Sequence, residues 1–382
     1  MLLLTLLLGA CSGPTPTSTL AARSESVTPS TSFDAHSPST SDHEIVQLAV
    51  ESIPQQFTTP LLEVSTDGQS ITWSTGADAG PGVAPDVFRF DPGNAVPHKV
   101  FASADRKAII GPIAISGSDV ALVEANPEAK PGVWQLWYVP GDGGPPKLVD
   151  HSDDDLQGPY PFLAMDDGRL VWTAFHSRPE GPRSELWMAR LPALQRELLD
   201  VQPLDQVEYW FPAIDGDHVV YGTVETTPTS VSRHVYLRDL GSPSTAAVRL
   251  DTSGHASMPA IRGDMVVWKE SPDNVLERGT LILFSLKSQR AQPIAFGDES
   301  AVNTPSIGNR FVAANVIDPT RFFLYDLASQ RSVLLRDFPP AGREVIVRPS
   351  VRGDMVVWSH APESEEADLA LEWSHLPTYP AN

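Results

Sequence analysis

The sequence predicts an all-β protein, a seven-bladed β-propeller built from four-stranded antiparallel blades. Three observations lead to this class: a heptapeptide that occurs twice, a turn frame that recurs at a regular spacing, and strand-like runs that occupy the same place in every repeat. The heptapeptide, RGDMVVW, occupies residues 262–268 and again residues 352–358. The copies lie 90 residues apart, which is too far for a local duplication and fits twice a shorter repeat.

The turn frame consists of a short apolar run, a turn rich in Gly, Asp and Asn, and a second apolar run. Its glycines are Gly68, Gly117, Gly168, Gly216, Gly263, Gly308 and Gly353, with spacings of 49, 51, 48, 47, 45 and 45 residues. A period in the forties is typical of propellers and solenoids. Seven frames predict seven blades. A six-bladed ring, with the first or second unit misassigned, remains the alternative.

Each unit can be divided into four short strands. The first ends at the turn, where a positive φ is tolerated, and the second is a run of β-branched and aromatic residues such as 265–268. A polar loop precedes a third strand, as at residues 86–90 and 134–139, and a fourth follows, as at 147–150 and 247–251. No segment shows a 3.6-residue apolar period over a dozen positions, so helix is expected to be minor. Four antiparallel strands repeated radially form a propeller blade.

The 36 prolines of the chain are expected between the strands, because proline has no N–H to donate to a ladder. The ends of the chain predict how the ring closes. The last unit stops after its third strand, at residues 368–373, while an unattached strand-like run, HEIVQLAVES, occupies residues 43–52. We expect the strand at residues 44–51 to pair with the third strand of the last unit and complete its blade.

The first residues, MLLLTLLLGAC, form an apolar run that ends in Leu-Gly-Ala-Cys and resembles the lipobox of bacterial lipoproteins. The resemblance implies that residues 1–10 are a signal peptide and that Cys11 is lipidated. Cys11 is the only cysteine, so an internal disulfide is excluded. Residues 11–43 are rich in Ser, Thr and Pro and predict a disordered tether, which leaves residues 44–382 for the propeller.

Charge and motifs limit the classes of function. A net charge of −21 and a pI near 4.7 argue against a nucleic-acid partner and against binding to an anionic membrane surface. The histidines are scattered without metal-ligand spacing, and no nucleophile elbow or phosphate loop is present, so no metal or cofactor is expected. We expect a monomer that contacts the membrane through its lipid anchor only. The two Arg-Gly-Asp tripeptides are interpreted as hairpin turns, not as adhesion motifs.

The turns TDGQSITWS, DDGRLVWTA and RGDMVVWSH, together with the strands VYLRDL and FFLYDL, resemble the repeats of the TolB-type, WD-repeat-like propellers. The resemblance covers roughly residues 44–382. It implies an extracytoplasmic bacterial protein of the periplasm or cell surface, and related blades serve as domains of peptidases and glycan-active enzymes. The shared residues are strand and turn positions, so they predict the fold and carry little about function.

Ligand sites on propellers lie where loops meet at a mouth of the channel, here the loops that enter each first strand and those between second and third strands. The candidate ligand-binding residues in these loops are Tyr160, His176, Arg183, Glu208, Tyr209 and Trp210. Aromatic rings beside carboxylates could stack on a sugar or hold a peptide side chain. The alternative is that Tyr160 and Trp210 pack between blades. The tryptophans at one repeated second-strand position, Trp73, Trp172, Trp268 and Trp358, are predicted to be core.

Two functions remain open. The first is a non-enzymatic binding or scaffold module that presents the propeller to a protein or cell-envelope partner. The second is a propeller enzyme, a glycan lyase or hydrolase, with an acid/base pair at the channel mouth. Charged residues from three or more blades gathered at one mouth would favour the enzyme. A channel lined by small and apolar residues would favour the binding module, which is the function that we expect.

Overall fold

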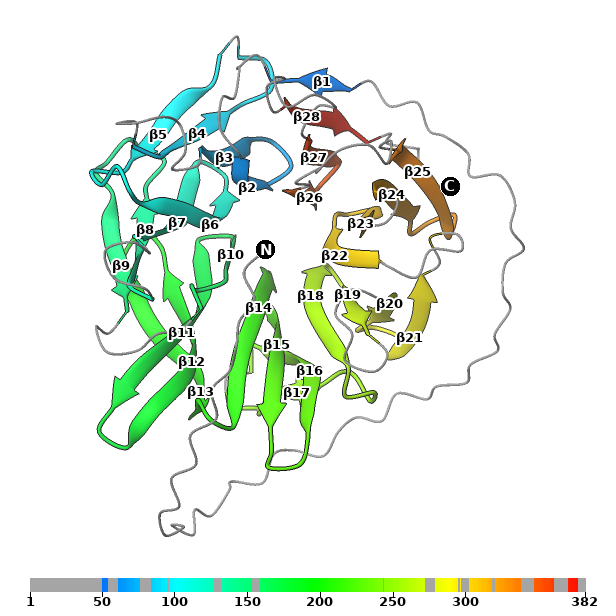
Figure 1. Ribbon diagram of the computed structural model, residues 1–382. Helices are drawn as coiled ribbons and strands as arrows, with labels where there is room; N and C mark the ends of the chain where they lie inside the picture. The colour runs from blue at the N-terminus through cyan, green and yellow to red at the C-terminus, as the bar shows by residue number, and fades with distance from the viewer. Residues whose placement is uncertain are drawn as a thin grey trace.

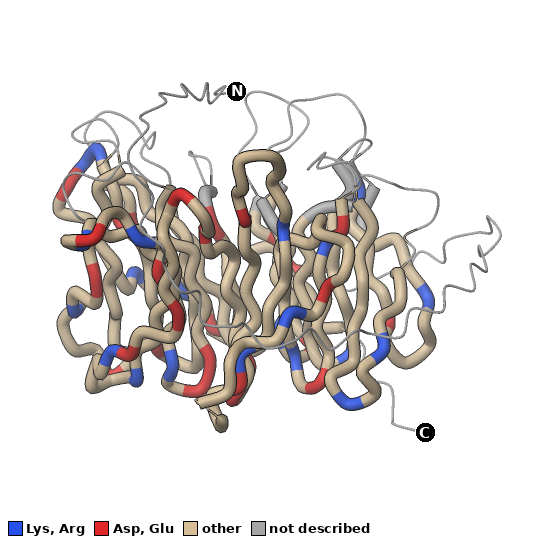
Figure 2. Tube along the Cα trace, turned by 90° about the horizontal axis from the view of Figure 1, so that it is seen from below, with Lys and Arg blue, Asp and Glu red and all other residues tan. Residues whose placement is uncertain are grey.

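The computed structural model is a ring of seven four-stranded antiparallel sheets around a central channel, as predicted (Figure 1). It describes residues 50–53, 61–75, 84–94, 96–126, 132–152, 159–242, 244–271, 279–294, 296, 302–317, 320–337, 347–360 and 370–376. Within these ranges there is no helix, and therefore none that is long and apolar enough to cross a membrane. Seen edge-on, acidic and basic residues are interspersed over the described part of the ring (Figure 2).

The strands of the first four blades follow the chain in order. Blade 1 contains β2 (Leu61–Thr66), β3 (Ile71–Thr75), β4 (Asp86–Phe90) and β5 (His98–Ala102), and blade 2 contains β6 (Ile109–Ser116), β7 (Asp119–Ala125), β8 (Trp134–Val139) and β9 (Lys147–His151). Blade 3 contains β10 (Leu163–Asp166), β11 (Arg169–Arg178), β12 (Gly181–Arg190) and β13 (Gln195–Pro203), and blade 4 contains β14 (Val207–Asp215), β15 (His218–Thr226), β16 (Val231–Asp239) and β17 (Val248–Arg249).

The last three blades complete the ring. Blade 5 contains β18 (Ala256–Arg262), β19 (Met265–Glu270), β20 (Thr280–Ser285) and β21 (Arg290–Ile294), and blade 6 contains β22 (Val302–Ile307), β23 (Phe311–Ile317), β24 (Thr320–Asp326) and β25 (Arg331–Asp337). Blade 7 contains β26 (Val347–Arg352), β27 (Met355–His360), β28 (Ala370–His375) and, from the other end of the chain, β1 (Glu51–Ser52).

The N-terminal strand closes the ring, as the sequence predicts. In the pairing of β1 with β28, Glu51 lies opposite Trp373 and Ser52 opposite Glu372, and the two strands are adjacent in Figure 1. The N–H of Ile53 then donates to the carbonyl of Leu371 at 3.0 Å. The expected strand began at residue 44, and its residues 44–49 lie outside the described residues.

The two Arg-Gly-Asp tripeptides form hairpin turns between the first and second strands of blades 5 and 7. Arg262 pairs with Met265, and Arg352 with Met355, across two-residue Gly-Asp turns. The glycine of each turn has a positive φ, 58° in the first and 59° in the second, a conformation that glycine adopts without steric cost.

Five prolines lie inside first strands, which corrects the expectation that prolines fall only between strands. Each occupies a break in the register between first and second strands: Pro112, Pro212, Pro259, Pro305 and Pro349. The residue before the proline has a positive φ at Phe211 (47°), Met258 (54°) and Thr304 (35°). These breaks are β-bulges, where two residues leave the ladder, so the missing proline N–H removes no ladder hydrogen bond.

The hydrophobic core lies between neighbouring blades. One cluster joins Val267 and Leu283 of blade 5 to Ile307 and Phe323 of blade 6. The repeated second-strand tryptophans, Trp73, Trp172, Trp268 and Trp358, are at most 1% exposed, which confirms them as core. Indole N–H groups of these tryptophans donate to carboxylates: Trp172 to Asp150 at 2.8 Å, Trp268 to Glu270 at 3.2 Å and Trp358 to Glu372 at 3.0 Å.

Candidate binding site

The channel has two different mouths. At the hairpin mouth the turns between first and second strands meet, and all of these turns are described: residues 67–70, 117–118, 167–168, 216–217, 263–264, 308–310 and 353–354. At the opposite loop mouth lie the connections between second and third strands and those between blades, several of which lie outside the described residues.

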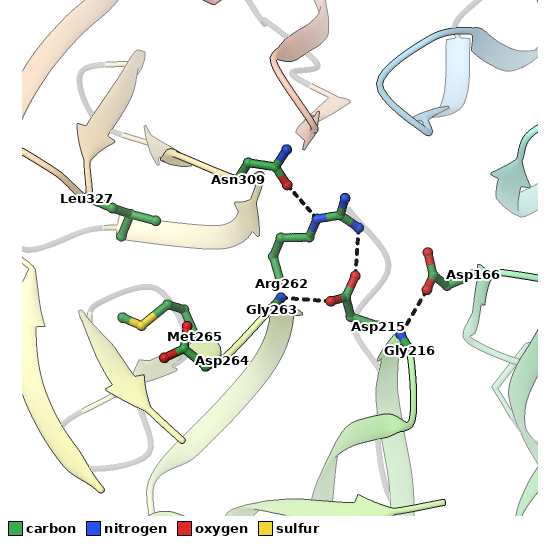
Figure 3. A pocket seen from close by; sticks show the side chains of 10 residues that line it. Asp166, Asp215, Gly216, Arg262, Gly263, Asp264, Met265, Asn309 and Leu327 are labelled. Carbon is green, nitrogen blue, oxygen red and sulfur yellow. Dashed lines mark hydrogen bonds and ion pairs between the residues drawn. The ribbon is translucent and has the colours of Figure 1, made fainter. Parts of the chain in front are cut away.

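Polar side chains from five blades, four of them charged, meet at the hairpin mouth. Arg262 of blade 5 donates through Nη1 to Asp215 Oδ1 of blade 4 at 2.6 Å and through Nε to Asn309 Oδ1 of blade 6 at 2.7 Å. Arg352 of blade 7 lies 3.0 Å from the same Asp215 oxygen and is also ion-paired with Asp166 of blade 3. Figure 3 shows how Arg262 lies between Asn309 and Asp215. We call these five residues the mouth cluster.

The side chain of Arg352 bridges the channel, because blade 7 lies across the ring from blades 3 and 4 (Figure 1). The carboxylates are also held by turn backbone: Gly216 N–H donates to Asp166 Oδ2 at 2.9 Å, and Gly263 N–H to Asp215 Oδ2 at 2.7 Å. The four charged side chains are only 15–29% exposed. Charge-assisted bonds in such shielded positions are stronger than exposed ion pairs, so the cluster should hold the mouth rigid.

A pocket of about 480 Å³ lies beside the mouth cluster, where the turns of blades 5 and 6 face each other (Figure 3). Its wall is formed by Asp166, Asp215, Gly216, Arg262, Gly263, Asp264, Met265, Gly308, Asn309 and Leu327. Asp264 is exposed, and its carboxylate makes no hydrogen bond or ion pair with the described residues. The pocket therefore combines a fixed guanidinium, two carboxylates fixed in the mouth cluster, a free carboxylate, an amide and two apolar side chains.

The structure brings only part of the predicted ligand site together. The indole N–H of Trp210 donates to Glu208 Oε2 at 3.0 Å, and burial raises the pKa of Glu208 despite this hydrogen bond. The Trp210 ring packs against Phe162 of the preceding blade, with ring centres 5.2 Å apart. Trp210 thus lies between blades 3 and 4, the packing position that the sequence left as its alternative.

The other predicted site residues lie in separate surroundings. His176 is buried in β11, where Nδ1 lies 2.7 Å from Glu185 Oε2 and Nε2 lies 3.2 Å from the carbonyl oxygen of His151. Arg183 is its partner in the β11–β12 register. Tyr209 is 1% exposed within the core shared by blades 3 and 4.

Tyr160 is half-buried against the core shared by blades 2 and 3, and burial raises the pKa of its hydroxyl. The six candidates therefore do not form one described cluster.

The mouth cluster was not predicted from the sequence, because the residues before the turns were interpreted only as turn chemistry. One signal was present. The last residue of the first strand is Asp166, Asp215, Arg262 and Arg352 in blades 3, 4, 5 and 7. Opposite charges at one repeated position that faces the channel indicate side chains that meet across it.

No protein-family model matches the chain, and no curated protein matches it. Among solved structures, the β-propeller domain of the Trilobed protease from Pyrococcus furiosus is 14% identical with a TM-score of 0.60, over 85% of this chain and 98% of that one. Acylaminoacyl peptidase from Pyrococcus horikoshii is 13% identical with a TM-score of 0.58, over 86% of this chain and 54% of that one. The chain thus spans about half the length of that peptidase. TolB from Acinetobacter baumannii is 12% identical with a TM-score of 0.45, over 81% of this chain and 78% of that one.

The first two likenesses show a shared β-propeller fold, which confirms the predicted architecture. The domain from the Trilobed protease is described as having an open velcro topology. In this chain β1 instead pairs with β28 and closes the last blade. The lipid anchor and the extracytoplasmic location stay predictions from the sequence.

Proposed function

We propose that this protein is a lipid-anchored, extracytoplasmic binding module without catalytic activity, and that it presents the hairpin mouth to a partner of the cell envelope. The observation that carries the proposal is the mouth cluster. Five blades contribute side chains that hold one another in place beside an open pocket. A recognition surface gains affinity when its groups are fixed before the partner arrives, because less conformational entropy is lost on binding.

Gathered charges at one mouth were expected to favour the enzyme, and such a cluster is present. Its internal bonding favours binding instead. A lyase or hydrolase needs an acid and a base that can exchange protons with the substrate. In Asp166 and Asp215, one carboxylate oxygen is bonded to arginine and the other to a turn N–H. Each oxygen of both carboxylates thus already accepts a hydrogen bond within the protein, which favours a structural role over acid/base chemistry.

The proposed attachment to a membrane rests on the lipobox-like end of the first eleven residues and on the tether that follows it. The propeller would then be held near a membrane by Cys11, with the tether of roughly 30 residues allowing a mean reach of about 30 Å. Replacement of Cys11 by Ser should release the protein from the membrane fraction and abolish incorporation of a metabolic lipid label. Equal labelling of wild type and variant would contradict the anchor.

Binding at the hairpin mouth can be tested by photo-crosslinking in intact cells. A photoreactive amino acid is placed at Asp217 or Asp354, two exposed turn residues at the hairpin mouth, and at Glu197, an exposed residue of the outer strand β13. We expect a discrete adduct from both mouth positions and none from Glu197. Equal adducts from all three positions, or no adduct from either mouth position, would rule out the hairpin mouth as the binding surface.

A further inference from the structure

We propose that the pocket between blades 5 and 6 binds a neutral saccharide. This inference rests on the proposed binding function and assigns a ligand class to its surface. Cavities of roughly 300–1,000 Å³ are typical of small-molecule sites, and this pocket of about 480 Å³ lies in that range.

The polar groups of the pocket include both donors and acceptors. Arg262 uses Nε and Nη1 within the mouth cluster, and its Nη2 has no partner among the described residues. Asn309 accepts through Oδ1, which leaves its Nδ2 donor for a ligand. The carboxylate of Asp264 supplies acceptors. Sugar hydroxyls donate and accept at once, so adjacent hydroxyls can bond to a carboxylate and to a guanidinium or amide together.

The apolar part of the wall comes from Met265 and Leu327, both half-buried at the edge of the core between blades 5 and 6. A pyranose ring has C–H faces as well as hydroxyl edges. Packing of such a face on these two side chains would remove apolar surface from water while the hydroxyls reach the polar groups. A small inorganic ion would leave this part of the pocket unused.

Charge selects a neutral ligand over a charged one. Three aspartates and one arginine line the pocket. Arg352 is not part of the wall but is ion-paired with Asp166 and Asp215, so with Arg352 the group carries one net negative charge. An anion would be repelled by Asp264 and by a protein of net charge −21. A cation would gain from Asp264 but face Arg262. A neutral polyol avoids both repulsions and can still use both charged groups as hydrogen-bond partners.

The second heptapeptide provides a matched control, because it has the same residues in a different environment. Asp354 occupies the place of Asp264 and is also exposed. Its neighbourhood is closed by blade 1: an added Cβ on Gly68 would lie 2.7 Å from the carbonyl oxygen of Arg352. Met355 is fully buried, whereas Met265 lines the pocket. Substitutions at Asp264 and Asp354 therefore change the same local sequence in two different environments.

The test is a titration of the full chain with glucose, N-acetylglucosamine and their β-1,4-linked disaccharides, followed by saturation-transfer NMR and calorimetry. Glucuronate and glucosamine serve as the anionic and cationic counterparts. We expect saturable binding of at least one neutral sugar and weaker binding of both charged ones. Asp264→Asn and Asn309→Ala should each lower the affinity for the neutral sugar by about tenfold, which corresponds to one hydrogen bond to a charged or well-placed polar group. Asp354→Asn should leave its affinity within about twofold.

The variants are first compared by thermal unfolding, and Asp264→Asn should fold normally because its side chain is exposed. The inference fails if no neutral sugar binds, if a charged sugar binds more tightly, or if the two aspartate variants behave alike. These results are separable from the binding function itself. If a partner is crosslinked at the hairpin mouth but no sugar binds, the proposed binding function stands and the proposed saccharide ligand is wrong.

Discussion

The two copies of RGDMVVW are identical in sequence and nearly identical in backbone, yet their side chains serve different purposes. In both, the turn aspartate carbonyl accepts an N–H from the end of the third strand: Leu286 to Asp264 at 2.7 Å and Leu376 to Asp354 at 2.6 Å. Both tryptophans, Trp268 and Trp358, are at most 1% exposed. The heptapeptide therefore encodes a hairpin and a core position in either blade.

The difference between the copies comes from the neighbouring blades. An added Cβ on Gly263 would meet no atom within 4 Å, whereas on Gly353 it would meet the Cα of Gly68 at 3.6 Å. Blade 1 thus covers the second copy, while blade 6 leaves a pocket beside the first. The arginines differ too: Arg262 bonds to the adjacent blades 4 and 6, and Arg352 reaches across the channel to blades 3 and 4. Local sequence sets the hairpin, and the adjoining blade sets what its side chains do.

Removal of β1 should produce the largest effect, because blade 7 depends on a strand from the other end of the chain and blade 5 does not. Ile53, just after β1, is 4% exposed in the core between blades 7 and 1. Deletion of residues 12–52 should lower the free energy of unfolding by at least about 3 kcal/mol or cause aggregation, because it opens a sheet edge and removes the strand that holds Ile53 in the core.

Deletion of residues 12–42 is the control and should leave stability unchanged, since the segment offers no apolar face to bury. Thermal and urea unfolding of both truncations would be compared. Equal midpoints and equal solubility would show that β1 does not close the ring.

The next largest effect is expected from replacing the methionine of each heptapeptide by alanine, which should cost much more stability in the second copy than in the first. Met355 is fully buried, with its Sδ 3.2 Å from Thr66 Oγ1 of blade 1, so Met355→Ala should cost about 2–5 kcal/mol. Met265 lines the pocket and is half-buried, so Met265→Ala should cost about 1 kcal/mol or less. Urea unfolding of the two variants checks this. Equal losses would mean that the copies have the same environment after all.

Replacing the arginine of each heptapeptide should give a smaller difference in stability, again with the larger loss in the second copy. Arg352 is 18% exposed and contacts two carboxylates, while Arg262 is 29% exposed and contacts one carboxylate and one amide. Arg352→Ala should destabilise by about 2 kcal/mol and Arg262→Ala by about 1 kcal/mol, because removal of either leaves a partly shielded carboxylate with fewer partners. The double variant should lose more than the sum, since both arginines bind the same Asp215 oxygen and either one alone still pairs with it. Strict additivity would contradict the shared network.

The sequence was sufficient for the blade count and the ring closure, because both depend on repetition. The turn glycines recur in every unit, and a seventh unit without a fourth strand required a strand from elsewhere. The prediction from the sequence was wrong for the first-strand prolines, which were expected between strands. Proline cannot donate a ladder hydrogen bond but is tolerated at a bulge. Several of these bulges have a positive φ at the residue before the proline, as at Phe211 and Met258, and the sequence gives no signal for that conformation.

The candidate site could be predicted less well, for a physical reason. Asp166 and Arg352 are 186 positions apart and meet only because the ring places blades 3 and 7 on opposite sides of one channel. Aromatic residues in long loops, such as Trp210, looked more like ligand contacts than turn residues did. Trp210 instead packs on Phe162, which buries apolar area in a blade interface. Function at this mouth depends on which turns become neighbours, a property of the closed ring.

The smallest expected effect is on the pH dependence of stability. We expect it to depend on His176 of blade 3 and not on the two heptapeptides. Burial alone lowers the pKa of His176, but the hydrogen bond to Glu185 and the nearby charges of Asp150 and Glu185 outweigh it, so the pKa is raised. A raised pKa in the folded state means that the charged imidazole stabilises the fold below the unfolded value of about 6.5, and that this stability is lost as the pH rises through the higher folded value. The melting temperature of the wild type should therefore fall more steeply between pH 6 and pH 9 than that of His176→Gln. The Met265→Ala variant, with His176 intact, should keep the wild-type slope. A slope that is unchanged in His176→Gln would show that the pair with Glu185 does not couple protonation to folding.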